Sequence, residues 1–278
     1  MSYYRFETRL ANFILYGSVI ITLVFFYIPI ATLIAFSFTE SRFLTFPIEG
    51  FSLKWYGALF AEKNFLPALW GSLKLAFIVT ILSTILGCAA AVAWMRFKFR
   101  FQRTFQALTF APLLFPQLML GVVMLLWFSI LGNFFDFSMA LWSAVVGHVV
   151  YITPFALIII AVQIHGFDDT LEDAARDSGC SNWEVLREIT IPILWPGIFS
   201  AGIFAFLLSW GNFYLTYSLS GTSRTLPTFV FSGIANGSSP IFPALATLTF
   251  IPAMLLVGLA DFFRRRASDR LKSGPTDI

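Results

Sequence analysis

Six long stretches of this chain contain no aspartate, glutamate, lysine or arginine. They cover residues 10–39, 75–95, 104–135, 137–167, 189–223 and 225–260. A helix that crosses the roughly 30 Å hydrocarbon core of a bilayer needs about 20 mostly apolar residues, so each stretch is long enough for one span. Hydrophobic residues make up 58% of the chain, which excludes disordered, collagen-like and disulfide-rich secreted proteins. The sequence therefore predicts an all-α integral membrane protein with six transmembrane helices.

We expect a single domain over residues 1–278, and the spans can be placed within it. Their expected positions are 11–36, 70–95, 107–131, 140–164, 196–219 and 243–263. The connecting segments on one side of the membrane contain thirteen Lys and Arg residues, and those on the other side contain four. Because loops rich in Lys and Arg stay in the cytoplasm, we expect both termini and the segment between the fourth and fifth spans to be cytoplasmic.

Ionisable groups are nearly absent from the middle of the expected spans. His148 is the one candidate there, although such groups usually mark proton relays and ion paths in the membrane. A histidine hydrogen-bonded within the helix bundle is the favoured interpretation. The sequence also lacks the H-E-x-x-H and G-x-S-x-G motifs of metalloproteases and serine hydrolases. A proton-coupled carrier and an intramembrane enzyme are both poorly supported.

The segment between the fourth and fifth spans, residues 165–195, is unusually acidic, and we name it the acidic segment. Seven acids and two bases fall within residues 168–188, a net charge of −5. A solvated loop that merely connects two spans is one interpretation of such a composition. A docking element for another protein is the other.

Signals for two short helices lie within the acidic segment. Thr170 or Asp169 can cap the first helix, and Asp173 or Glu172, three residues later, can complete a capping box. Glu172 and Arg176 are spaced to pair on its exposed side. Gly179 can end that helix in a left-handed conformation without steric cost.

The second short helix is expected to begin with a capping box of Ser181 and Glu184. It runs to about Thr190, and Pro192 is expected to end it. Together the signals predict a helix, a glycine break and a second helix.

This pattern resembles the signature E-A-A-x3-G-x9-I-x-L-P of permease subunits of binding-protein-dependent ABC importers. The matching positions are Asp173, Ala174, Ala175, Gly179, Ile189, Ile191 and Pro192. All spacings agree. Asp173 replaces the Glu of the signature, with Glu172 beside it, and Ile191 replaces the Leu.

The resemblance implies a type I ABC importer permease (MetI-like) in the bacterial cytoplasmic (inner) membrane, crossing it several times. In that family the corresponding loop couples the permease to an ABC ATPase dimer. The resemblance therefore implies that Asp173, Ala174, Ala175 and Gly179 contact the ATPase, within a coupling loop that also includes Glu172, Ile189, Ile191 and Pro192. The chain lacks a phosphate-binding G-x-x-x-x-G-K-[ST] motif. We therefore expect it to be no enzyme and to bind no cofactor, while the separate ATPase chain uses ATP and Mg.

Other expected partners follow from the same resemblance. They are a second permease subunit, which family habit makes a paralogue, an extracytoplasmic solute-binding protein and membrane lipid. A net charge of +3 gives no reason to expect nucleic acid.

Further stretches are similar to permeases of the spermidine/putrescine type. They read SFTESRF at 37–43, GFSLKWYGALF at 50–60, RFKFRF at 96–101 and LPTF at 226–229. The expected substrate path includes Trp210, Asn212 and Tyr214 of the fifth span, where a ring face and a carbonyl oxygen suit an amine cation. This region contains no carboxylate, so the solute is expected to be a polyamine or another small organic molecule.

A six-span channel or scaffold with a cytoplasmic docking loop for a regulatory protein is the alternative function. It would work without nucleotide and without a binding protein. The sequence shows no ring-forming carboxylate and no selectivity filter that would favour it.

Overall fold

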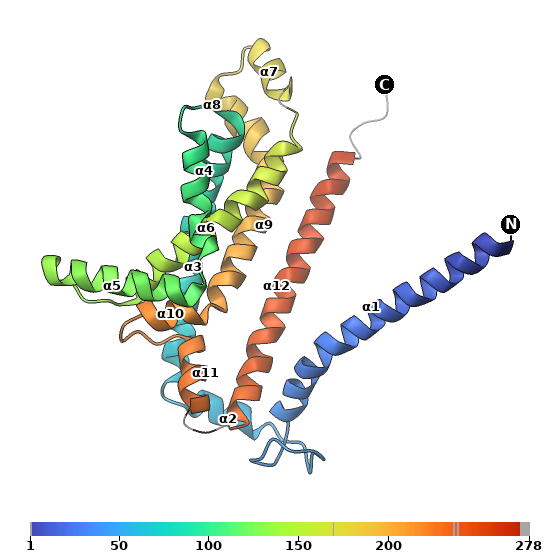
Figure 1. Ribbon diagram of the computed structural model, residues 1–278, viewed down its shortest axis with the longest axis vertical. Helices are drawn as coiled ribbons and strands as arrows, with labels where there is room; N and C mark the ends of the chain where they lie inside the picture. The colour runs from blue at the N-terminus through green and yellow to red at the C-terminus, as the bar shows by residue number, and fades with distance from the viewer. Residues whose placement is uncertain (1, 169, 236, 238, 273–278) are drawn as a thin grey trace. The chain divides into compact units, whose positions relative to one another are not determined.

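The computed structural model describes residues 2–168, 170–235, 237 and 239–272. In this part of the chain every regular element is helical (Figure 1), and the one strand-like feature is an isolated bridge between Thr39 and Phe51. Six of the described helical stretches are long and apolar enough to cross a membrane. The predicted all-α protein with six spans is confirmed.

Short helices lie between the long ones. In chain order the α-helices are α1 (Ser2–Ser37), α2 (Lys54–Ala61), α3 (Phe65–Arg96), α4 (Gln102–Phe110), α5 (Gln117–Phe135), α6 (Leu141–His165), α7 (Thr170–Asp177), α8 (Asn182–Val185), α9 (Ile191–Trp210), α10 (Phe213–Leu219), α11 (Leu226–Ala235) and α12 (Ile241–Lys272). A 3₁₀ turn, Ala111–Leu114, precedes α5, and a π turn, Leu186–Thr190, joins α8 to α9.

The chain forms two compact units. The first contains α1, α2 and the beginning of α12. From Ala11 to Leu33 of α1, nearly all apolar side chains are exposed or half-exposed, as in a helix surrounded by lipid. The second unit runs from Asn64 to Ser232 and resumes at Ala253. It contains the acidic segment and most of the buried core.

In the second unit α3, α6 and α9 pack side by side along much of their lengths (Figure 1). Small residues form the contact between α3 and α6. A Cβ atom added at Gly87 would lie 2.7 Å from the Cβ of Ala156 and 2.9 Å from the backbone nitrogen of Leu157. Small residues allow membrane helices to approach closely, where dispersion contacts and not the hydrophobic effect hold them together. The three helices therefore form one tightly packed group.

His148 lies in the first third of α6 and is fully buried. Its Nδ1 atom lies 2.9 Å from the hydroxyl of Ser209 in α9, and its Nε2 atom lies 3.0 Å from the hydroxyl of Thr216 in α10. Both ring nitrogens therefore have hydrogen-bond partners within the bundle. These contacts confirm the expectation that His148 is hydrogen-bonded within the helix bundle.

The third span begins later than the expected residue 107. Residues up to Phe110 belong to α4, and the membrane helix α5 begins only at Gln117. Phe115 precedes Pro116 and takes an extended conformation with φ −94° and ψ 138°, because a proline disfavours the helical conformation of the residue before it. The absence of Asp, Glu, Lys and Arg from residues 104–135 concealed the break.

The fifth span also differs from the expected 196–219. A continuous helical stretch runs from Asn182 to Trp210, and α10 follows as a separate helix. Asn212 causes the interruption, since its side-chain oxygen accepts a hydrogen bond of 3.2 Å from the Leu215 N–H and so caps α10.

Replacing Gly87 with valine tests the close packing of α3 against α6. Because the new side chain meets backbone as well as a methyl group, we expect Gly87→Val to destabilise the protein by about 1–3 kcal/mol. Thermal unfolding in detergent measures the change. Gly17→Val is the matched control, because a Cβ at Gly17 meets no atom within 4 Å. Equal midpoints for the two variants would refute the packing argument.

Candidate functional site

The first helix of the acidic segment, α7, ends at the predicted glycine. Gly179 has a φ of +93°, which only a residue without a Cβ adopts without strain. The Gly179 N–H donates to the Arg176 carbonyl at 2.9 Å, and the Cys180 N–H donates to the Ala175 carbonyl at 3.1 Å. These two bonds make a Schellman motif. The predicted left-handed stop is confirmed.

The second helix begins with the predicted capping box. The Glu184 N–H donates to the Ser181 hydroxyl at 3.3 Å, and the Ser181 N–H donates to the Glu184 carboxylate at 2.7 Å. The Ser181 backbone and hydroxyl hydrogen bonds hold the pKa of Glu184 below its usual range.

The expectation that Pro192 ends this second helix is wrong. The helix passes through the π turn Leu186–Thr190 and continues as α9. In a regular α-helix the proline ring clashes with the carbonyl group four residues earlier. The wider π turn before Pro192 relieves this clash. The second helix of the acidic segment and the fifth span therefore form one continuous helical stretch.

Glu172 is the common acceptor of a hydrogen-bonded cluster, and its side chain is only 6% exposed. One carboxylate oxygen accepts hydrogen bonds from Arg96 at 2.5 Å and from Arg176 at 3.2 Å, and the other accepts from the Thr190 hydroxyl at 2.5 Å. The predicted Glu172–Arg176 pair forms. Its expected position on the exposed side is wrong, because Arg96 and Thr190 draw the carboxylate inward.

The protonation state of Glu172 follows from these partners. Burial by itself raises the pKa of this carboxyl group, because it disfavours the charged form. The hydrogen bonds from Thr190, Arg96 and Arg176 and the positive charge of Arg96 outweigh burial, and they hold the pKa below its usual range. Glu172 is therefore ionised at neutral pH, and its negative charge pairs with the positive charges of Arg96 and Arg176.

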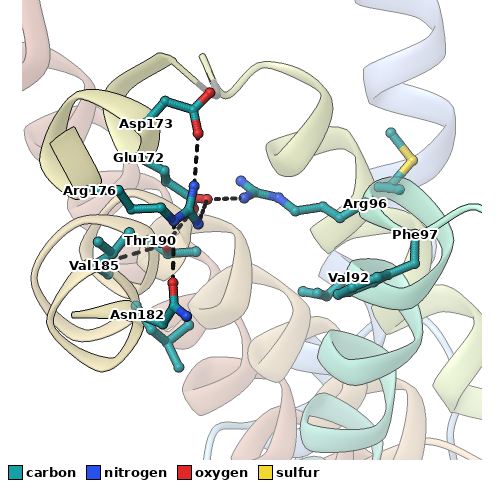
Figure 2. A pocket seen from close by; sticks show the side chains of 11 residues that line it. Val92, Arg96, Phe97, Glu172, Asp173, Arg176, Asn182, Val185 and Thr190 are labelled. Carbon is teal, nitrogen blue, oxygen red and sulfur yellow. Dashed lines mark hydrogen bonds and ion pairs between the residues drawn. The ribbon is translucent and has the colours of Figure 1, made fainter. Parts of the chain in front are cut away.

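The cluster lines a pocket of about 570 Å³ between the end of α3 and the two helices of the acidic segment. Figure 2 shows Arg96 reaching from α3 toward Glu172, while Arg176 faces the same carboxylate from α7. Arg176 also donates to Asp173 at 2.9 Å and to Asn182 at 3.4 Å. Its guanidinium group thus joins α7 to α8.

The other predicted residues of the segment lie on more open surfaces. The Asp173 side chain is 73% exposed, Ala174 is exposed, and Ala175 is half-buried. Ile189 is half-buried in the π turn, whereas Ile191 and Pro192 are exposed at the beginning of α9. Asp173, Ala174 and Gly179 are therefore exposed on α7 and its C-terminal turn.

Trp210, Asn212 and Tyr214 lie around the break between α9 and α10. Trp210 is half-buried and stacks on Phe206, with ring centroids 5.9 Å apart. Asn212 is buried and caps α10, and Tyr214 is 47% exposed. The three residues are close in sequence, but their side chains lie in different surroundings.

Sequence reasoning missed two members of the cluster. The sequence shows Arg96 as the first residue of the basic stretch RFKFRF and Thr190 as the expected end of a helix, and neither role indicates a contact with Glu172. The available signal was the position of Arg96 at the last residue of its span, where the side chain can reach an acidic segment on the same side of the membrane. Nothing in the local sequence singles out Thr190.

The cluster is suited to binding and positioning. Among the described residues, no three His, Cys, Asp or Glu side chains come together to hold a metal ion. Glu172 is an ionised carboxylate whose two oxygens are both occupied by donors, which is an arrangement for fixing one element to another.

Comparison with known proteins shows the family to which this chain is related. Residues 83–272 match the family model described as the binding-protein-dependent transport system inner membrane component. The spermidine/putrescine transport system permease protein PotC of Haemophilus influenzae is 30% identical over 87% of this chain and 93% of its own length. The putrescine transport system permease protein PotI of Escherichia coli K12 is 32% identical over 86% of each chain.

A solved structure agrees with the fold. A chain from a bacterial ABC transporter involved in the import of the acidic polysaccharide alginate matches with a TM-score of 0.72 over 94% of this chain and 98% of its own, at 14% identity. This likeness supports the helical architecture. The chain belongs to the family of binding-protein-dependent transport system inner membrane components, and it is a multi-pass permease subunit of the bacterial inner membrane.

Proposed function

We propose that this permease imports a polyamine such as spermidine or putrescine, delivered by an extracytoplasmic binding protein. The support is the likeness to PotC and PotI, which extends over most of their lengths and of this chain. Another small organic solute is the alternative that the uncharged fifth span favours. Family membership removes the reason for proposing a channel or scaffold.

The observation that carries the transport mechanism is the form of the acidic segment: a short helix, a left-handed glycine and a second helix continuous with a span. We propose that this segment, with both chain termini, lies in the cytoplasm, as the distribution of Lys and Arg favours. Asp173, Ala174, Ala175 and Gly179 then form the surface that contacts an ABC ATPase dimer. Ile189, Ile191 and Pro192 connect that surface to α9.

Two further partners belong to the proposal. A second permease subunit, a paralogue of this one, completes the membrane pathway, and the ATPase chains use ATP and Mg. One domain over residues 1–278 supplies this chain's share of the pathway.

For the substrate path we propose the region around the break between α9 and α10. Tyr214, which is 47% exposed, has a ring available to an amine cation. The Asn212 side-chain oxygen already accepts the Leu215 N–H, so we assign Asn212 to shaping the backbone beside Trp210.

Purification of the assembled transporter tests the proposed function. The chain is extracted from native membranes in mild detergent and captured, and the proteins that accompany it are identified by mass spectrometry. We expect an ATPase with a phosphate-binding loop and a second six-span permease. Recovery of this chain alone, or as a symmetric ring, would contradict the proposal.

Replacing Gly179 tests the glycine break. A side chain at φ +93° costs about 1–2 kcal/mol, so we expect Gly179→Leu to lower ATP-dependent uptake roughly tenfold at unchanged abundance. A Cβ at this position meets no atom within 4 Å, so the effect comes from backbone strain and not from a clash. Gly179→Asn is the milder control, because asparagine tolerates left-handed conformations. Normal uptake by Gly179→Leu would argue against the break.

Replacing Asp173 tests the docking surface. Its side chain is exposed, so Asp173→Lys should fold normally, and we expect it to reduce the amount of ATPase that co-purifies. Asp173→Glu keeps the charge and should retain the ATPase at the level of the unaltered protein. Unchanged ATPase recovery with the lysine variant would remove Asp173 from the docking surface.

A further inference from the structure

We propose that Glu172 is a positioning residue that fixes α7 to the ends of α3 and α9, so that a displacement of α7 is transmitted to both membrane helices. This inference rests on the proposed function, because it explains how a docking helix is joined to the spans. It concerns the buried carboxylate of α7, whereas the exposed residues Asp173, Ala174 and Gly179 are assigned to contact with the ATPase.

The burial pattern of α7 is the first observation. Of its eight residues, all described, Glu172 is the only buried one. Leu171, the largest apolar side chain of the helix, is 49% exposed. Apolar packing therefore contributes little to holding α7 in place. A helix of eight residues is also too short to be stable by itself in water.

The hydrogen bonds of Glu172 are the second observation. Its carboxylate accepts from Arg96 at the end of α3, and from Thr190 at the junction with α9. A buried carboxylate must keep such partners, because leaving it unpaired out of water is strongly unfavourable. The side chain therefore holds α7 to two spans through bonds that are costly to break.

The two partners are themselves held in place. Arg96 is the last residue of α3, its side chain is 18% exposed, and its guanidinium carbon lies 4.8 Å from the centre of the Phe167 ring. Thr190 is the last residue of the π turn and is buried. Glu172 is thus joined to ordered groups and not to mobile surface side chains.

The first test measures the attachment of α7 without any partner protein. Cys180 is exposed directly after the Gly179 turn, and it can carry a nitroxide spin label in a Cys88→Ser background. We expect the label on the full chain in lipid nanodiscs to be ordered. Glutamine is neutral, so Arg96 and Arg176 bind it more weakly than they bind the Glu172 carboxylate. This loss changes the equilibrium between attached and detached α7 by roughly tenfold, so Glu172→Gln should give a clearly larger fraction of mobile label.

Matched variants separate positioning from a general loss of structure. Asp177→Asn makes the same charge change on an exposed residue of α7 and should leave the spectrum unchanged. Arg96→Lys retains a cationic donor and should preserve more order than Arg96→Met. Thr190→Val removes one hydroxyl donor without a large change of shape, and it carries the test if Glu172→Gln does not accumulate as folded protein.

The second test measures transport in the reconstituted complex of permeases, ATPase and binding protein. With radiolabelled spermidine and putrescine as the probes, we expect Glu172→Gln to retain the ATPase and its ATP hydrolysis, while the amount of probe transported per ATP falls several-fold. Asp177→Asn should keep the ratio of the unaltered complex. If even the unaltered complex neither binds an ATPase nor transports, the proposed function fails, and the spin-label test still decides whether Glu172 fixes α7.

Two results would overturn the inference. One is an ordered label at Cys180 in Glu172→Gln and in Thr190→Val, which would show that α7 is held by other contacts. The other is an unchanged ratio of transport to ATP hydrolysis in Glu172→Gln, which would show that the attachment has no part in coupling.

Discussion

A carboxylate that leaves water must keep hydrogen-bond donors around it, and in this protein that requirement joins three helices at one point. Glu172 is nearly inaccessible to solvent, and its donors come from α3, from α7 itself and from the π turn before α9. Glu172 is the only buried residue of α7, and Leu171, its largest apolar side chain, is 49% exposed. The position of α7 therefore depends on charge pairing, which is directional, and not on apolar contact, which would allow the helix to slide.

The two acidic residues at the beginning of α7 have opposite environments. Glu172 is turned toward the spans, while the neighbouring Asp173 is exposed. Adjacent residues of a helix point about 100° apart, so one short helix can be fixed on one side and remain open to a partner on the other. Arg176 touches both carboxylates. A contact made at Asp173 thus lies one side chain away from the buried cluster.

Local signals in the sequence predicted the elements that depend on local chemistry. The apolar stretches, the glycine stop at Gly179 and the Ser181–Glu184 capping box could be predicted, because each follows from neighbouring residues. The break at Pro116 and the continuous helix through Pro192 were missed, since the effect of a proline depends on the turn before it. The Arg96–Glu172–Thr190 cluster joins residues as much as 76 positions apart, a distance over which spacing rules carry no information.

The cluster has consequences for the spans because of how those spans are packed. α3, α6 and α9 are in close contact through Gly87, Ala156 and Ala201, which leave little room for relative movement. Arg96 ends the first of these helices, and Thr190 precedes the last. A force applied to α7 therefore enters the group at two of its three helices, and tight packing transmits it to α6. In the proposed importer, rigid contact between α7 and these ends is what makes ATP-driven movement of a small helix sufficient to reorient the spans.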